Sequence, residues 1–200
     1  MSHQYFVASE GDVYQESVKQ NGSDKYAKVD IEGAKALLAG ATPTVRILYN
    51  IANPNRVNAF EAIQASAAEA GFVIEDVGRK DWGSQLGSDI YDASIFGWIS
   101  PGVGNAALPQ IFGAGGGGNY NQYSNPKVTE LTEKSQFMTD ADELNKAKFD
   151  IDRMTFEDAY GLPLFQSPGL MAHTDRITGV TYMANQTGPI WNFWEWKVSE

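Results

Sequence analysis

The chain has 200 residues, no cysteine and a formal charge of −10, from 15 Lys and Arg against 25 Asp and Glu. A hydrophobic share of 42%, with five Trp and ten Phe, is ample for a packed core, so we expect one domain or one large lobe of a bigger protein. The acidic charge argues against nucleic acid and anionic lipid as partners, because phosphate groups repel an acidic surface without a Lys/Arg cluster. The lack of cysteine excludes disulfides, thiol nucleophiles and cysteine zinc sites, and no run of 18 apolar residues predicts a membrane span.

The first residues bear on whether the chain is complete. Met1-Ser-His-Gln is typical of an added start, and no leader follows it, so we expect a fragment excised from a longer protein. Residues 1–43 are interpreted as a connecting segment that ends in a short helix over 30–39. Asp30 is placed to cap this helix, and Gly40 follows where a left-handed residue commonly ends one.

A β-α-β unit is predicted next. The β-branched run 44–49 predicts a strand, and Asn53-Pro54 predicts the start of a helix that Gly71 ends. Residues 72–77 predict a second strand. Because a helix that joins two neighbouring strands makes them parallel, a parallel sheet is implied.

Later elements extend this pattern to the end of the chain. In order, we predict a helical turn at 82–86, a strand over 91–98, a helix from the Asn125-Pro126 cap through Phe137, a helix from the Asp140 capping box to about Tyr160, and short strands over 162–165 and 170–172. The predicted fold class is α/β, with a mixed, mostly parallel sheet flanked by helices.

The domain organisation follows from these elements. We expect an α/β ligand-binding lobe over 44–175 and an aromatic tail over 176–200. The tail carries three Trp but too few residues to bury them against itself. It is therefore expected to pack on the other lobe of a full-length protein, or to pair two copies of the fragment as a dimer.

Four stretches between Tyr26 and Val128 form a series. They are Tyr26-Ala-Lys-Val-Asp-Ile-Glu-Gly-Ala-Lys-Ala-Leu-Leu38, Ala59-Phe-Glu-Ala-Ile-Gln-Ala-Ser-Ala-Ala-Glu-Ala-Gly-Phe72, Tyr91-Asp-Ala-Ser-Ile-Phe-Gly-Trp98 and Tyr120-Asn-Gln-Tyr-Ser-Asn-Pro-Lys-Val128. In order and spacing the series resembles the carboxyl-terminal part of the extracytoplasmic solute-binding proteins of ABC importers. The resemblance is to family 5, which includes oligopeptide-, dipeptide- and nickel-binding members.

The resemblance implies one lobe of a type II periplasmic-binding-protein fold. It also implies a function: capture of a peptide or other small solute between two lobes, and delivery to an ABC permease. Such a protein would be extracytoplasmic, either periplasmic or a lipoprotein anchored at the outer face of the cell membrane. It would need no cofactor and would not be an enzyme.

The candidate ligand-binding residues lie in the loops beyond the strand 91–98, because ligands of open α/β sheets bind beyond the carboxyl ends of the strands. They are Trp98, Ile99, Ser100, Asn105, Asn119 and Tyr120. Each has a structural alternative: packing between sheet and helix for the indole, and loop solvation or turn formation for the polar residues. The four glycines 115–118 lack a phosphate-binding pattern and any Lys or Arg, which favours a flexible connector.

Ligand class and chemistry stay open. Peptide binders of the family commonly carry an acid soon after the Gly-Trp pair, whereas Ile99-Ser-Pro-Gly-Val-Gly-Asn105 has none, which puts peptide binding through this loop in doubt. The two alternatives are a hydrolase-like α/β enzyme that uses loop carboxylates and a stand-alone interaction module built on the tail. His3 and His173 are the only histidines and are not at ligand spacing, which argues against a metal site or a Ser-His-Asp triad.

Overall fold

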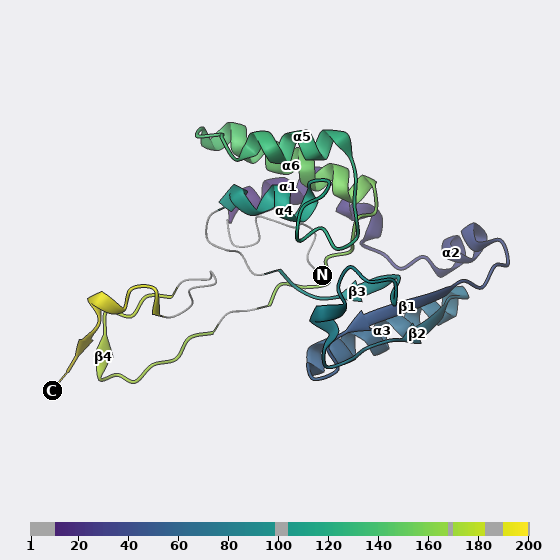
Figure 1. Cartoon of the computed structure of the whole chain (residues 1–200), viewed down its shortest axis with the longest axis horizontal. Coiled ribbons are helices and arrows are strands. Elements are labelled where there is room, and N and C mark those ends of the chain that lie inside the picture. The colour runs from purple at the N-terminus through teal and green to yellow at the C-terminus, as the bar shows by residue number, and fades with distance from the viewer. Residues whose placement is uncertain (1–10, 99–103, 168–169, 183–189, 200) are drawn as a thin grey trace. The chain divides into compact units, whose positions relative to one another are not determined.

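The computed structural model describes residues 11–98, 104–167, 170–182 and 190–199 (Figure 1). The chain divides into two compact units. One, Lys25–Trp98, is called here the sheet unit; the other, Met1–Asp24 with Ile99–Glu200, is called the helical unit. The lobe predicted over 44–175 takes residues from both units, and its behaviour as one body stays a prediction.

The sheet unit contains a three-stranded parallel sheet, as the β-α-β pattern predicts. Strands β1 (Thr44–Tyr49), β2 (Val73–Asp76) and β3 (Ala93–Ile95) lie in the order β2-β1-β3. The strand expected over 91–98 is therefore shorter at both ends. Asp92 lies just before β3 and accepts hydrogen bonds from the main-chain and side-chain nitrogens of Arg46 on β1, which fixes the start of the β1–β3 ladder.

Helix α3 (Pro54–Ala70) covers one face of this sheet (Figure 1). It begins where the Asn53 side chain accepts hydrogen bonds from two backbone N–H groups of the first turn, and it ends at Gly71, whose φ of 107° suits a residue without a side chain. The Phe60 ring of α3 stacks on Tyr49 of β1 with 4.8 Å between ring centres, at the centre of this core. A shorter helix, α2 (Ile31–Leu38), precedes the sheet and is capped by Asp30.

The helical unit contains four α-helices within the described residues: α1 (Asp12–Gln20), α4 (Leu108–Phe112), α5 (Pro126–Ser135) and α6 (Ala141–Glu157). Helices α5 and α6 start at the predicted caps, where Asn125 and Asp140 accept backbone hydrogen bonds. Their core joins α4, α5 and α6 through buried side chains: Leu108, Phe112, Val128 and Ile151.

Two predictions of local structure are wrong. Residues 12–20 form α1 rather than a connecting segment; its fully buried residue, Ser17, is polar, and its apolar residues Val13, Tyr14 and Val18 are only half-buried. Residues 162–165 and 170–172 form no strands, since neither stretch has a strand partner in the described part of the chain and Leu170 is 93% exposed.

The tail forms a small hairpin-like module. Strand β4 (Ile177–Thr178) pairs antiparallel with β5 (Lys197–Val198), and the buried Asn192 side chain donates to the Gly179 carbonyl at 2.8 Å. Tail packing on another lobe and pairing as a dimer both stay predictions. In the described ranges, the helices are too short or too polar to cross a membrane.

Candidate functional site

Three aromatic rings gather beyond the carboxyl end of β3 in the sheet unit. Phe96 lies between Trp82 of the 3-10 turn η2 (Trp82–Gln85), at 6.5 Å between ring centres, and Trp98, at 5.4 Å with an edge-to-face geometry. Trp98 is 48% exposed. We call Trp82, Phe96 and Trp98 the ring row; it places an apolar wall where parallel sheets commonly bind ligands.

A cation lies against this row. The guanidinium carbon of Arg56 is 4.2 Å from the centre of the Trp82 ring, a cation–π contact. Arg56 is in the first turn of α3, which follows β1, so it belongs to the same carboxyl edge of the sheet. Within the described residues, its buried Nη1 has no hydrogen-bond partner, and burial lowers the pKa of Arg56.

Arg56 was missed by the sequence reasoning, which looked only at loops after residues 91–98. A signal was present in Asn53-Pro-Asn-Arg56: a helix cap directly after a strand fixes the first turn of the helix at the strand's carboxyl end. The proximity of Trp82, 26 positions further along the chain than Arg56, depends on strand pairing and has no local signature.

The end of β2 contributes polar groups to the same edge. The backbone N–H of Arg79 donates to the Tyr49 carbonyl at 3.0 Å, and an isolated bridge pairs Asn50, one residue beyond β1, with Arg79, three residues beyond β2. The Tyr49 hydroxyl donates to Asp76 at 3.0 Å. Burial, together with this bond to a carboxylate, raises the pKa of Tyr49 to about 12, so the phenol stays protonated at neutral pH.

Three of the sequence-predicted site residues have no described side chain. Ile99 and Ser100 lie outside the described residues, and Asn105 is in the 3-10 turn η3 (Gly104–Ala107) with its side chain outside them. Their contact with a ligand stays a prediction. Trp98 is the member of the set that the structure places in the ring row.

Asn119 is held by its own loop in the helical unit. Its side chain is buried, donates to the carbonyls of Gly113 at 3.0 Å and Tyr123 at 2.7 Å, and accepts from the Tyr123 N–H at 2.9 Å. Both amide hydrogens are used, which leaves one lone pair for a ligand. The neighbouring Tyr120 is half-buried. Ligand contact by either residue remains a prediction, and for Asn119 the observed role is to shape the loop.

The glycine loop forms a hydrogen-bonded turn, and the flexibility expected of it stays a prediction. Gly116 donates to the Gly113 carbonyl, and the N–H groups of Gly117 and Gly118 donate to Gln110. A Cβ on Gly116 would lie 2.4 Å from two backbone carbonyl oxygens, so the close turn itself requires glycine there. Open hollows of about 460 Å³ and 660 Å³ flank the loop and the α5 cap.

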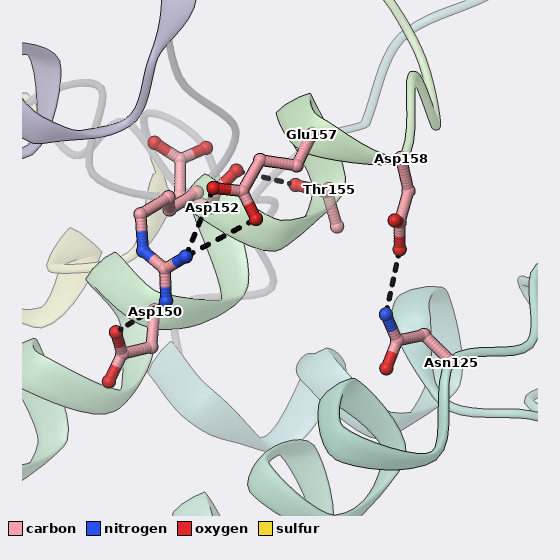
Figure 2. Close-up of polar contacts among 7 residues, drawn as sticks. Asn125, Asp150, Asp152, Thr155, Glu157 and Asp158 are labelled. Carbon is pink, nitrogen blue, oxygen red and sulfur yellow. Dashed lines mark hydrogen bonds and ion pairs between the residues drawn. The ribbon is translucent and has the colours of Figure 1, made fainter.

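A carboxylate joins the ends of α5 and α6 beside the larger hollow. Asp158 accepts from the Tyr123 hydroxyl at 2.6 Å. It also accepts from the Asn125 side chain at 2.7 Å (Figure 2). These donors hold the pKa of Asp158 below its ordinary value. Burial, together with the bond to Asp158, raises the pKa of Tyr123. An ionised, hydrogen-bonded carboxylate is a structural anchor and a poor general acid.

Metal ligation finds no support in the residues that are described. Among them, no group of three or more His, Asp or Glu could hold an ion. His173, the histidine in this part of the chain, is exposed, with Nδ1 2.9 Å from the Thr174 carbonyl.

Comparison with known proteins gives the fold a family. No family model matches the chain. The oligopeptide-binding protein OppA of Mycobacterium tuberculosis is 25% identical over 153 residues, which cover 73% of this chain and 25% of OppA. Among solved structures, the periplasmic EDTA-binding protein EppA has a TM-score of 0.84 at 20% identity, over 100% of this chain and 40% of EppA. The oligopeptide-binding protein AppA of Bacillus subtilis, in complex with a nonapeptide, has a TM-score of 0.62 at 15% identity, over 86% of this chain and 38% of AppA.

The chain therefore has a solute-binding-protein fold. It is that of the family 5 solute-binding proteins of ABC importers, as the resemblance predicts. The chain spans about a quarter of the length of the curated relatives it matches.

Proposed function

We propose that the chain is part of an extracytoplasmic solute-binding protein that captures a small solute between two lobes and delivers it to an ABC permease. The observation that carries this proposal is the agreement in fold with EppA along the whole chain, joined to the sequence match with OppA. Capture of this kind needs no covalent step. Solute contacts made with both lobes favour the closed form over the open one.

The chemistry of the described side chains supports binding rather than catalysis. Hydrogen bonds from Arg46 lower the pKa of Asp92 to about 2, and those from Tyr123 and Asn125 lower the pKa of Asp158. A carboxyl group that serves as a general acid needs the opposite shift. We therefore assign these carboxylates to structure and propose that the protein is not an enzyme.

The proposed ligand contacts are assigned to each unit separately. In the sheet unit they are the ring row with Trp98, and in the helical unit they are Ile99, Ser100, Asn105, Asn119 and Tyr120. AppA is in complex with a nonapeptide, and EppA is named as an EDTA-binding protein. We propose that solutes of this kind would contact the exposed indole of Trp98 and backbone groups of the loops.

The tail is proposed to pack on the other lobe of the complete protein. Ile190, Phe193, Trp194 and Val198 are each more than 60% exposed in the described structure, on a module whose fold Asn192 already fixes from within. Exposed apolar groups on a rigid module favour a docked state. We further propose a periplasmic location or a lipid anchor at the outer face of the membrane for the complete protein.

Solute capture is tested with the complete protein purified in parallel with this chain. A panel of nonapeptide, nickel–histidine complex and EDTA is screened by thermal unfolding, where a ligand at about 100 times its Kd adds roughly 2.7 kcal/mol. We expect one class to stabilise the complete protein, and the 200-residue chain alone to bind much more weakly. Turnover of generic esters or glycosides by the complete protein would contradict the proposal.

A pair of variants checks the site. Trp98→Ala is expected to weaken solute binding at least tenfold, because the indole is among the proposed ligand contacts. Phe137→Ala removes an aromatic side chain that is 83% exposed in the helical unit and should leave affinity unchanged. Equal affinities for the two variants would remove Trp98 from the site.

A further inference from the structure

Arg56 differs from the ion-paired cations of the described structure. Arg46 pairs with Asp92 at 2.8 Å, and Arg153 pairs with Asp150 and Glu157 at 3.2 and 3.1 Å. In the described ranges no carboxylate lies within ion-pair distance of Arg56, although the chain carries 25 acidic residues. An acidic protein that leaves a partly buried guanidinium without a counter-charge has a positive centre that an anion would stabilise.

The guanidinium of Arg56 has hydrogen-bonding capacity that the described residues leave unused. The guanidinium carbon lies over the Trp82 ring at 4.2 Å from its centre, and a guanidinium carries its N–H groups in its own plane. Its buried Nη1 finds no acceptor among the described residues. A buried N–H without an acceptor is costly, and an acceptor that arrives in that plane recovers the loss.

Acidic groups near this edge have partners of their own. Asp76 accepts from the Tyr49 hydroxyl and from the Gly78 N–H at 2.8 Å. Asp81 accepts from the Gln85 side chain at 3.2 Å. In these contacts the two carboxylates accept hydrogen bonds from groups other than Arg56.

We propose that Arg56 and the ring row form a subsite for a carboxylate carried on an apolar group of the ligand. The planar fork of a guanidinium matches a carboxylate with two parallel hydrogen bonds, and the three rings contact the apolar part beside it. This inference rests on the proposed function and narrows it to solutes with a carboxylate. The subsite is complete within the sheet unit, since Arg56, Trp82, Phe96 and Trp98 all belong to Lys25–Trp98.

The test uses the 200-residue chain and a matched pair of probes, 3-phenylpropanoate and its neutral amide, 3-phenylpropanamide. Indole N–H resonances of Trp82 and Trp98 are followed in ¹⁵N–¹H spectra during titration. We expect saturable shifts of the Trp82 resonance with the acid, with a Kd on the order of millimolar, and at least fivefold weaker binding of the amide.

Three variants separate the guanidinium from general charge. Arg56→Gln should weaken the acid at least fivefold and leave the amide unchanged. Lys80→Gln removes the same charge from the end of the β2 segment and should bind the acid like the parent chain. Arg56→Lys keeps the charge but loses the planar fork, so its affinity for the acid should lie between those of Arg56→Gln and the parent chain. If Arg56→Gln does not fold, weaker binding of the acid by Arg56→Lys than by Lys80→Gln tests the inference instead.

Each contrary result overturns the inference. These results are equal binding of acid and amide, no binding of either probe, and equal losses in Arg56→Gln and Lys80→Gln. The proposed function fails separately, through the solute panel with the complete protein. Capture of a solute that is indifferent to Arg56→Gln would leave that function standing and refute the carboxylate subsite.

Discussion

A buried carboxylate holds α1 against α6, and its removal offers the sharpest test of the helical unit. Asp152 is 1% exposed on α6 and accepts from the Ser17 hydroxyl at 3.0 Å and from the Asn21 side chain at 2.9 Å. Both donors come from the segment at the start of the described chain, more than 130 positions away. The contact therefore carries much of the order of α1.

The perturbation is Ser17→Ala. Loss of a hydrogen bond to a charged group costs about 1.5–3 kcal/mol, and alanine recovers roughly half a kcal/mol of helix propensity at a position inside α1. The net cost is then about 1–2.5 kcal/mol, which raises the opening equilibrium of α1 by roughly 5- to 70-fold.

Native-state hydrogen exchange of the α1 amides measures this opening directly. Tryptophan fluorescence is unsuitable, because the five indoles lie in the sheet unit and the tail: Trp82, Trp98, Trp191, Trp194 and Trp196. Ser84→Ala, an exposed serine in the sheet unit, is the control and should leave α1 exchange unchanged.

A double-mutant cycle isolates the charge. In an Asp152→Asn background the bond from Ser17 becomes neutral and about half as strong, so the cost of Ser17→Ala should fall by a similar fraction. Identical costs in the two backgrounds would refute the reasoning, as would α1 exchange no faster in Ser17→Ala than in Ser84→Ala.

Two further predictions concern the glycine loop and the acid limb of stability. Gly116→Ala should lower the free energy of unfolding by about 1–3 kcal/mol, since its Cβ would lie 2.4 Å from two carbonyl oxygens. The control is Gly83→Ala, whose Cβ would meet nothing within 4 Å and which should be neutral. Equal urea midpoints for the two variants would contradict this prediction. Hydrogen bonds from Arg46 hold the pKa of Asp92 at about 2 against an ordinary 3.8, so the pair stabilises the fold above about pH 4 and its contribution is lost as pH falls toward 2. In Asp92→Asn the free energy of unfolding should therefore depend less on pH between about 4 and 2. A midpoint near pH 4 in a carboxyl ¹³C titration of Asp92 would contradict the lowered pKa.

Helix starts in this chain are readable because their chemistry is local. Asn53-Pro54, Asn125-Pro126 and the Asp140 capping box each place a side-chain oxygen within a few residues of the N–H groups that it accepts from. Helices α3, α5 and α6 begin there as predicted. A cap depends on nothing beyond its own turn, so no tertiary information is needed.

Helix α1 was not predicted from the sequence, because the residues that this segment buries most deeply are polar. Ser17 and Asn21 are almost fully buried, yet they lie at positions where a periodic pattern would require apolar residues. Their burial is offset by a carboxylate supplied from α6, which no pattern within Asp12–Gln20 can reveal. The short strands expected over 162–165 and 170–172 fail in the opposite direction: their apolar residues satisfy the local pattern, but no neighbouring strand pairs with them.

The proposed ligand class, solutes with a carboxylate, follows from one sequence observation and one structural observation. Both indicate that the site favours a negatively charged group of the ligand. Between Ile99 and Asn105 the chain has no acid with which to hold a ligand's ammonium group. In the sheet unit, the structure places the guanidinium of Arg56 against Trp82, and its buried Nη1 has no acceptor among the described residues. A site without a fixed anion and with a fixed cation favours the carboxylate end of a solute over its amino end, because each charge buried between lobes needs an opposite charge beside it. A full-length protein that held only amine-bearing, carboxylate-free solutes would break this agreement.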